Sequence, residues 1–153
     1  MTLIIEKPIE NTYQKNMASK LFVDSDILLD LFLVRHPFYT YTQKLLKLAE
    51  ENKIDLFTSS VIINNLFYFI ARDKNKQIAK QSLNILIDIC KVLPVDESTV
   101  KLALESNFND FEDALQYFTA VEFNCEQILT RNLKHYKQST IPVLTAEQFL
   151  RTL

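Results

Sequence analysis

The stretch LFVDSDILLD, residues 21–30, decides the fold class. Its first three residues are apolar and predict a short buried strand, which ends at Asp24. Apolar residues then recur at helical spacing until Pro37, which closes the predicted helix. A strand that leads directly into a helix is typical of α/β proteins.

The same alternation of short apolar strands and amphipathic helices continues to the end of the sequence. Because helices separate the strands, we predict an α/β sandwich with a mainly parallel central sheet of about four to five strands and helices on both faces. We expect a single domain over residues 20–153, preceded by an N-terminal arm over residues 1–19. The predicted strands are residues 21–23, 55–58, 92–95, 127–130 and 142–144.

The composition is that of a globular domain, with 153 residues of which 48% are apolar and 24% charged. The sequence contains no glycine, which excludes Walker and GxGxxG loops, since these need glycine to let the backbone approach a phosphate. Two histidines, His36 and His135, exclude a multi-histidine zinc site, and we expect both in loops or on the surface. Cys90 and Cys125 lie in apolar stretches and are expected to be reduced core residues.

The overall charge does not favour nucleic acid as a partner. The formal net charge is −2 and the isoelectric point is near 5.7, so any contact with nucleic acid must be local or carried by a metal. We see no signal peptide and no membrane-spanning segment, and therefore expect a cytoplasmic protein that does not bind a membrane.

Acidic residues gather at two places. Ligands of parallel α/β sheets bind beyond the carboxyl ends of the strands, and Asp24 and Asp26 follow the first strand there. Asp110 and Asp113 lie one turn apart on the predicted helix 110–123 and can address one ion. Clusters of carboxylates suit Mg²⁺ or Mn²⁺ and the hydrolysis of phosphodiesters.

A purely structural role is the alternative for the second group. Acids in a first helical turn are favoured by the helix dipole, and Asn109 with Glu112 resembles a capping box. For the first group, we expect Asp26 to cap the following helix, which leaves Asp24 free for function. The helical wheel predicts a buried stripe formed by Phe111, Ala114, Leu115, Phe118 and Val121.

Six motifs, taken together, resemble the PIN domain family, and in particular its small bacterial branch that includes VapC-like toxins. The resemblance implies a three-layer α/β/α sandwich, an acidic pocket that holds one or two Mg²⁺ or Mn²⁺ ions, and ribonuclease activity on single-stranded or tRNA-like RNA. It also implies a homodimer and, for a toxin, an antitoxin protein as partner. The motifs are VDSDILLD (23–30), RHPFY (35–39), FTSSVIINNLFYFI (57–70), DFEDALQYFTA (110–120), ILTRN (128–132) and IPVLTAEQFL (141–150).

The resemblance assigns roles to individual residues. Asp24 matches the first aspartate of the family and Asp113 the aspartate of its DA-containing helix, while Asp110 matches an additional acid of this branch. Asp26 stands where the family usually has asparagine. Asn65 stands where most members carry glutamate and Asn132 where many carry a fourth aspartate. The resemblance therefore implies a pocket with fewer anions, weaker metal affinity and low activity.

Other residues near the strand ends are candidates for binding substrate. Ser25 and Thr130 can orient water or phosphate, or can simply make hydrogen bonds within turns. Arg131 follows a strand end and is a candidate phosphate contact. Residues 131–153 hold four basic residues against one acid, a net charge of +3 that can seat an RNA backbone.

Two further functions stay open. The asparagines fit a catalytically attenuated module that binds RNA or protein without cleaving it. Alternatively, an apolar strand followed by Asp24 and Asp26 resembles the DxD motif of haloacid-dehalogenase-type phosphatases, in which the first aspartate is a covalent nucleophile.

Overall fold

The computed structural model of the protein describes residues 17–153. The N-terminal arm expected for residues 1–19 lies, up to residue 16, outside the described residues. The elements are β1 (Ser19–Val23), α1 (Ser25–Phe32), α2 (Phe38–Glu50), β2 (Ile54–Ser59), α3 (Ser60–Asp73), α4 (Lys76–Ile89), β3 (Cys90–Leu93), α5 (Glu97–Glu105), α6 (Phe111–Glu122), β4 (Gln127–Leu129), the 3-10 helix η1 (Leu133–Tyr136), β5 (Val143–Leu144) and α7 (Ala146–Leu150).

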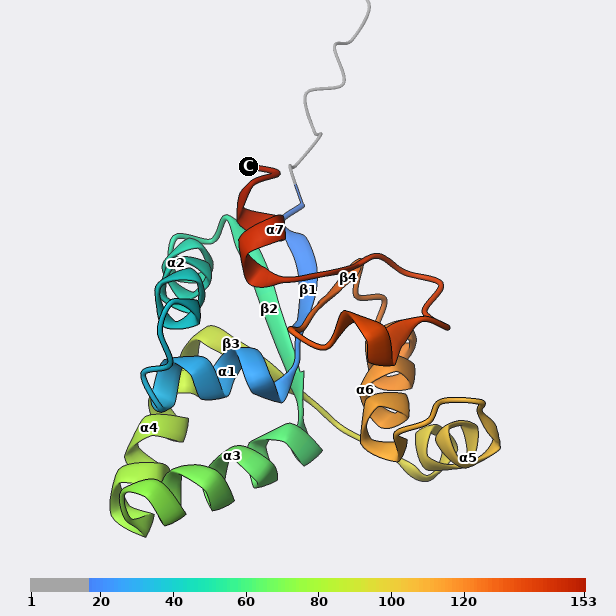
Figure 1. Cartoon of the computed structure of the whole chain (residues 1–153), viewed down its shortest axis with the longest axis horizontal. Helices are drawn as coiled ribbons and strands as arrows, with labels where there is room; N and C mark the ends of the chain where they lie inside the picture. Colours follow the sequence, from blue (N-terminus) through green and yellow to red (C-terminus); the bar gives the residue numbers. More distant parts are fainter. Residues whose placement is uncertain (1–16) are drawn as a thin grey trace, which may run out of the picture.

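The five strands form one sheet in the order β3-β2-β1-β4-β5, and every neighbouring pair is parallel. The central strand β1 carries the sequence LFV at residues 21–23, and all three side chains are buried. Continuous burial along a strand means that both faces of the sheet are covered there. The predicted α/β fold with a parallel sheet is thereby confirmed (Figure 1).

The helices pack in neighbouring groups around this sheet. In the view of Figure 1, α1, α2 and α4 lie to the left of β1 and β2, α3 runs below them, and α5 and α6 lie to the right. Helix α1 contacts α2 and α3, α3 contacts α4, and α5 contacts α6. Cys90 and Cys125 are free and buried in the core, as expected from the sequence.

Two local predictions are wrong. The third strand begins at Cys90 and not at residue 92, because α4 ends at Ile89 and β3 pairs at once with β2. On α6, Phe111 and Val121 of the predicted buried stripe are exposed. The helix instead buries a neighbouring face that includes polar side chains, because the Ser59 hydroxyl of β2 donates a hydrogen bond to Gln116 Oε1 (2.6 Å).

Caps place the helix starts at the carboxyl ends of the strands. Ser59 caps α3, Asp96 caps α5, and Thr145 forms a capping box with Gln148 at α7. Helices α1 and α3 start where β1 and β2 end, at the lower edge of the sheet in Figure 1. None of the helices within residues 17–153 is both long and apolar enough to cross a membrane.

Candidate acidic active site

Asp24 occupies the end of the central strand and is almost completely buried. It is the N-cap of α1, with its Oδ1 accepting a hydrogen bond from the Ser25 backbone N–H (2.7 Å). Its Oδ2 accepts hydrogen bonds from Thr130 Oγ1 (2.9 Å) and from the Tyr136 hydroxyl (3.1 Å). The sequence interpretation that Asp26 caps this helix is wrong, because Asp24 is the residue with extended backbone geometry before the first helical turn.

Asp26 joins α1 to the end of β4. Its Oδ1 accepts from the Ile27 N–H (2.7 Å), and its Oδ2 accepts from the Arg131 backbone N–H (2.9 Å). Thr130 Oγ1 also lies 3.4 Å from Asp26 Oδ2, and the Asn132 N–H donates to this hydroxyl (3.1 Å). The TRN segment therefore holds both aspartates of the first strand end in place.

Asp113 comes from α6 and approaches the same place. It is largely buried, and its Oδ2 lies 2.8 Å from Nδ1 of His135 on η1. Burial raises the pKa of Tyr136, and the charges of Asp24 and Asp113 add to this effect. Tyr136 and His135 are neighbours on η1, and they contact Asp24 and Asp113 respectively. Two acids that are far apart in the sequence are thus both contacted by η1.

The acids of this centre resist ionisation. Burial, followed by the charge of Asp26, raises the pKa of Asp24 to about 7. Burial also raises the pKa of Asp26 and of Asp113, and the charge of Asp110 adds to the effect on Asp113. A cation placed among these carboxylates would relieve both their poor solvation and their repulsion.

Asp110 is the N-cap of α6, because its Oδ1 accepts a hydrogen bond from the Asp113 N–H (2.9 Å). The predicted capping box of Asn109 and Glu112 is therefore wrong, because Asp110 is the residue that caps the helix. Asp110→Ala is expected to lower the free energy of unfolding by about 1 kcal/mol, as for other N-caps. Urea unfolding checks this, with Asp96→Ala at the N-cap of α5 as the matched control.

The two variants also separate a cap from a metal ligand. If Asp110 only caps α6, both variants keep the Mn²⁺ affinity of the wild-type protein. A loss of Mn²⁺ affinity in Asp110→Ala alone would add a ligand role, and an unchanged free energy of unfolding would contradict the capping role.

The side chains of three predicted site residues lie around the centre and have other contacts than its carboxylates. The Asn65 amide on α3 donates to Glu112 Oε1 on α6 (2.8 Å). Ser25 is half-buried, and its contact with Asp24 is made through its backbone N–H. Asn132 is exposed and reaches Thr130 through its backbone N–H. The structure therefore brings together Asp24, Asp26, Thr130 and Asp113 more closely than the asparagines.

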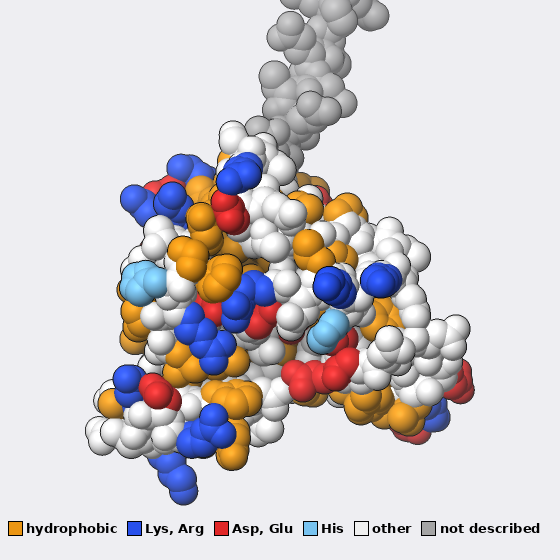
Figure 2. All heavy atoms as spheres, viewed as in Figure 1, with side chains coloured by type: hydrophobic (Ala, Val, Ile, Leu, Met, Phe, Trp, Pro, Cys, Tyr) orange, Lys and Arg blue, Asp and Glu red, His pale blue; other side chains and the backbone are white. Residues whose placement is uncertain are grey.

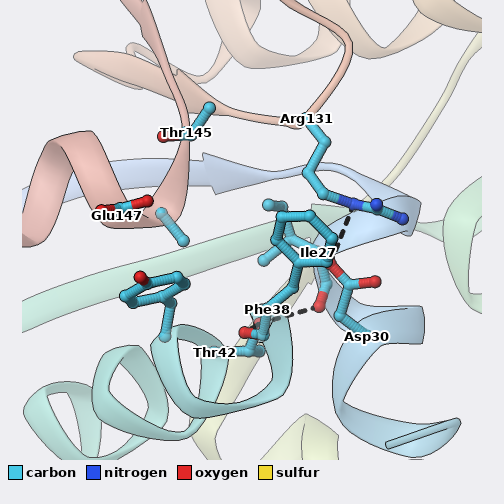
Figure 3. Close-up of a pocket in the computed structure, with 9 residues that line it drawn as sticks. Ile27, Asp30, Phe38, Thr42, Arg131, Thr145 and Glu147 are labelled. Carbon is cyan, nitrogen blue, oxygen red and sulfur yellow. Dashed lines mark hydrogen bonds and ion pairs between the residues drawn. The ribbon is translucent and has the colours of Figure 1, made fainter. Parts of the chain in front are cut away.

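Arg131 lies in a different environment from the one predicted. Its Nε is 3.0 Å from Oδ2 of Asp30, whose side chain is fully buried, and its guanidinium stands over the Phe38 ring at 4.3 Å (Figure 3). Both Asp30 carboxylate oxygens and the Arg131 Nε lack a hydrogen-bond partner among the described residues. Charge therefore holds this pair together, with Arg35 Nη1 at 4.0 Å from Asp30 as a second cation.

The donor types fit a divalent cation of the Mg²⁺ class. No group of three or more histidine, cysteine, aspartate or glutamate side chains within residues 17–153 is arranged to hold a metal ion. Mg²⁺, however, is commonly held by one or two carboxylates, with waters and substrate phosphates as its other ligands. Asp24 and Asp113 supply that number of carboxylates, and burial, which raises the pKa of both, is a cost that a bound cation would offset.

Sequence reasoning missed four residues of this region: Tyr136, His135, Glu112 and Asp30. Tyr136 contacts Asp24 across 112 positions of the chain, a separation at which no local pattern operates. His135 is exposed as expected, but the expectation contained no contact with Asp113. The HY pair at residues 135–136, shortly after TRN, is the only signal that pointed to this contact.

A parallel sheet with a buried aspartate at the end of its central strand, and a second acid brought to it by a helix, defines an α/β protein with an acidic strand-end site. Comparison with known families then identifies the class: the model of the PIN domain matches residues 20–134. The chain belongs to the PIN domain family, and the resemblance found in the sequence is confirmed.

Relatives agree with this assignment. The chain is 33% identical over 138 residues to Ribonuclease VapC1 of Aquifex aeolicus, an alignment that covers 86% of this chain and 94% of the relative. Among solved structures, it is similar to VapBC2 from Rickettsia felis bound to a promoter DNA fragment, with a TM-score of 0.61, 18% identity and coverage of 81% and 96%. It is also similar to VapC20 of Mycobacterium tuberculosis, a toxin that cleaves the sarcin-ricin loop, with a TM-score of 0.56, 16% identity and coverage of 71% and 86%.

Proposed function

We propose that the protein is an endoribonuclease that hydrolyses RNA phosphodiester bonds with a water activated by Mg²⁺ or Mn²⁺. The observation that carries the proposal is the convergence of Asp24 and Asp113 on η1 at the end of the central strand, where Tyr136 contacts Asp24 and His135 contacts Asp113. The family and the curated ribonuclease among its relatives support a nuclease.

Asp24 and Asp113 would hold the cation, with Asp110 and Asp26 as assisting acids. When bound, the ion supplies a Lewis acid and a lowered pKa for an attacking water. The chain's own groups hold the acids in position: Thr130 donates to Asp24, and the Arg131 backbone orients Asp26. We favour one ion over two, because one Mg²⁺ is commonly held by one or two carboxylates and Asp24 and Asp113 supply that number.

We further propose that the activity is weak. Asn65 and Asn132 bring no charge, and an amide oxygen binds a cation less strongly than a carboxylate. Glu112 accepts a hydrogen bond from Asn65, which places a further carboxyl group beside α3, although burial raises its pKa.

A toxin role is the physiological part of the proposal. Several structural neighbours are toxin–antitoxin complexes, which supports an antitoxin protein as partner and a cytoplasmic setting. Helices α3 and α4 expose single apolar side chains, among them Tyr68 and Ile85, which a homodimer would cover. The substrate would be single-stranded or tRNA-like RNA, as the resemblance to the family implies.

The direct test is cleavage of a mixed single-stranded RNA pool with Mg²⁺, Mn²⁺ or EDTA. We expect cleavage that needs the metal and falls by at least about 100-fold in Asp113→Asn, because a metal ligand is lost. Asp88→Asn, at an exposed acid on α4, is the matched control and should keep wild-type activity. Equal cleavage by both variants would contradict the assignment of Asp113.

The comparisons give no support to the two alternatives, the attenuated binding module and the haloacid-dehalogenase-type phosphatase. They differ from the proposal in measurable ways. A binding module retains RNA without metal-dependent products, and a phosphatase forms a phosphoryl–Asp24 intermediate, which a metal-activated water does not produce.

A further inference from the structure

A polar pocket of about 350 Å³ lies beside the acidic centre, and no role described above uses it. It is lined by residues 108–110 of the loop before α6 and by Lys134, His135, Lys137 and Gln138 around η1. Its volume is within the range of pockets that bind small ligands. Figure 2 shows basic, acidic and histidine side chains next to one another on this part of the surface.

The pocket opens next to the candidate active site. His135 lines it and contacts Asp113 Oδ2 at 2.8 Å, and Asp110 lines it while capping the helix that carries Asp113. An occupant of the pocket would therefore be one side-chain layer away from the reacting phosphodiester. This placement suits the nucleotide next to the scissile bond.

An aromatic ring is fixed on one wall of the pocket. Phe108 is half-buried, with ring centroids 5.2 Å from Tyr117, 6.2 Å from Phe118 and 6.3 Å from Tyr136. The loop that carries it is tied to the segment after η1, because the Gln138 amide donates to the Asn107 carbonyl. A rigid aromatic ring is the usual partner of an unpaired base.

The charges of the pocket fit a phosphate backbone. Lys134 and Lys137 are exposed and lie three positions apart on and just after η1. Asp110 is the one acid of the lining, and its Oδ1 is already engaged by the Asp113 N–H. The amides of Asn109 and Gln138 add donors and acceptors of the kind that read base edges.

We propose that this pocket binds one nucleotide of the RNA substrate next to the scissile phosphate. Phe108 supports the base, Lys134 and Lys137 bind the flanking phosphates, and Asn109 and Gln138 contact the base edge. The inference rests on the proposed function, because it takes RNA as the occupant, and it assigns to this pocket part of the protein's selectivity for RNA.

The test measures binding without cleavage. In the Asp24→Asn background, fluorescence anisotropy gives the Kd of a labelled single-stranded RNA of mixed sequence over a range of salt concentrations. Lys134→Ala combined with Lys137→Ala should raise the Kd about tenfold at low salt and reduce the slope of log Kd against log salt by about 1.4, since each phosphate contact on a single strand contributes about 0.7.

Lys44→Ala combined with Lys47→Ala is the matched control, because these exposed lysines of α2 have the same spacing. The control should keep both the Kd and the salt slope. Equal changes of Kd and salt slope in the two double variants would overturn the proposal. A Lys134 and Lys137 variant that loses antitoxin binding but keeps RNA binding would also overturn it.

Base recognition has its own readout. Asn109→Ala should change the ratio of the Kd values for short oligo(A), oligo(U) and oligo(C), while melting at the wild-type temperature. If the ratio of these Kd values is the same in Asn109→Ala as in the parent protein, the pocket does not contact a base edge, and this part of the proposal is contradicted. Because binding is measured in a variant that does not cleave, absence of ribonuclease activity would count against the proposed function and not against the pocket.

Discussion

Asp24→Asn is expected to make the metal-free protein more stable at pH 8 while it removes RNA cleavage. Asp24 is almost completely buried, and burial together with the charge of Asp26 raises its pKa from a usual value near 3.8 to about 7. A difference of this size corresponds to on the order of 4 kcal/mol against the charged form. Asparagine carries no charge, so the variant should gain about 2 to 4 kcal/mol, with the loss of charge-assisted hydrogen bonds offsetting the rest.

The sign of the pH dependence follows from the direction of this shift. Between pH 3.8 and about 7 the folded protein holds a proton on Asp24 that the unfolded chain has released, so wild-type stability falls as the pH rises through this window. The asparagine side chain of the variant does not titrate. The two proteins should therefore have similar stability near pH 4 and differ most above pH 7.

Urea unfolding in EDTA at several pH values measures the difference. Excess Mg²⁺ should raise the melting temperature of the wild-type protein at pH 8 and leave that of Asp24→Asn almost unchanged, because the ion binds the charged carboxylate. A variant that is less stable than wild type at pH 8 in EDTA would contradict the raised pKa of Asp24.

Arg131→Ala is expected to destabilise the protein by about 2 to 3 kcal/mol at pH 8. The substitution leaves the fully buried Asp30 carboxylate without its nearest cation, and Arg35 at 4.0 Å is too distant to replace it. Removing one partner of a buried pair commonly costs about 3 to 5 kcal/mol. We expect a lower value because the Arg131 side chain is 30% exposed and the pair is partly screened by solvent.

This effect also depends on pH. Burial raises the pKa of Asp30 to about 6 even with Arg131 present, and loss of the cation should raise it further. Below that value Asp30 is protonated in the fold, so the stabilities of wild type and variant should approach each other near pH 5 and diverge above pH 6.

Urea unfolding at the two pH values, together with a double-mutant cycle, checks the pair. Asp30→Asn combined with Arg131→Ala should cost less than the sum of the single changes. If Arg131→Ala instead unfolds like the wild type and only weakens RNA binding, the phosphate contact predicted from the sequence is correct and the structural role is not.

The elements that follow local patterns could be predicted from the sequence. The uninterrupted apolar run at residues 21–23 marks a strand buried on both faces, and β1 is that strand. The α6 stripe could not be predicted, because the burial of Gln116 depends on a hydroxyl from β2 that no helical wheel contains. Helix periodicity alone therefore placed the exposed Phe111 and Val121 in the core.

The acids of the candidate site follow strand ends and helix starts, which is why Asp24 and Asp113 could be predicted from the sequence. Their hydrogen-bond partners could not be predicted in this way. Tyr136 and Thr130 reach Asp24 over 112 and 106 positions of the chain. Arg131 was expected to face the substrate because it follows a strand end, but the buried charge of Asp30 on α1 draws its side chain to the α1 side. Such choices depend on the assembled fold.

Cleavage of single-stranded RNA by the wild-type protein and by Asp24→Asn, with Mg²⁺ or Mn²⁺ and with EDTA, tests the central claim most directly. The account predicts products only for the wild type with metal, and a variant that remains folded by circular dichroism but gives none. Cleavage by folded Asp24→Asn at the wild-type rate, or cleavage by the wild type in EDTA, would contradict a metal-dependent centre at Asp24.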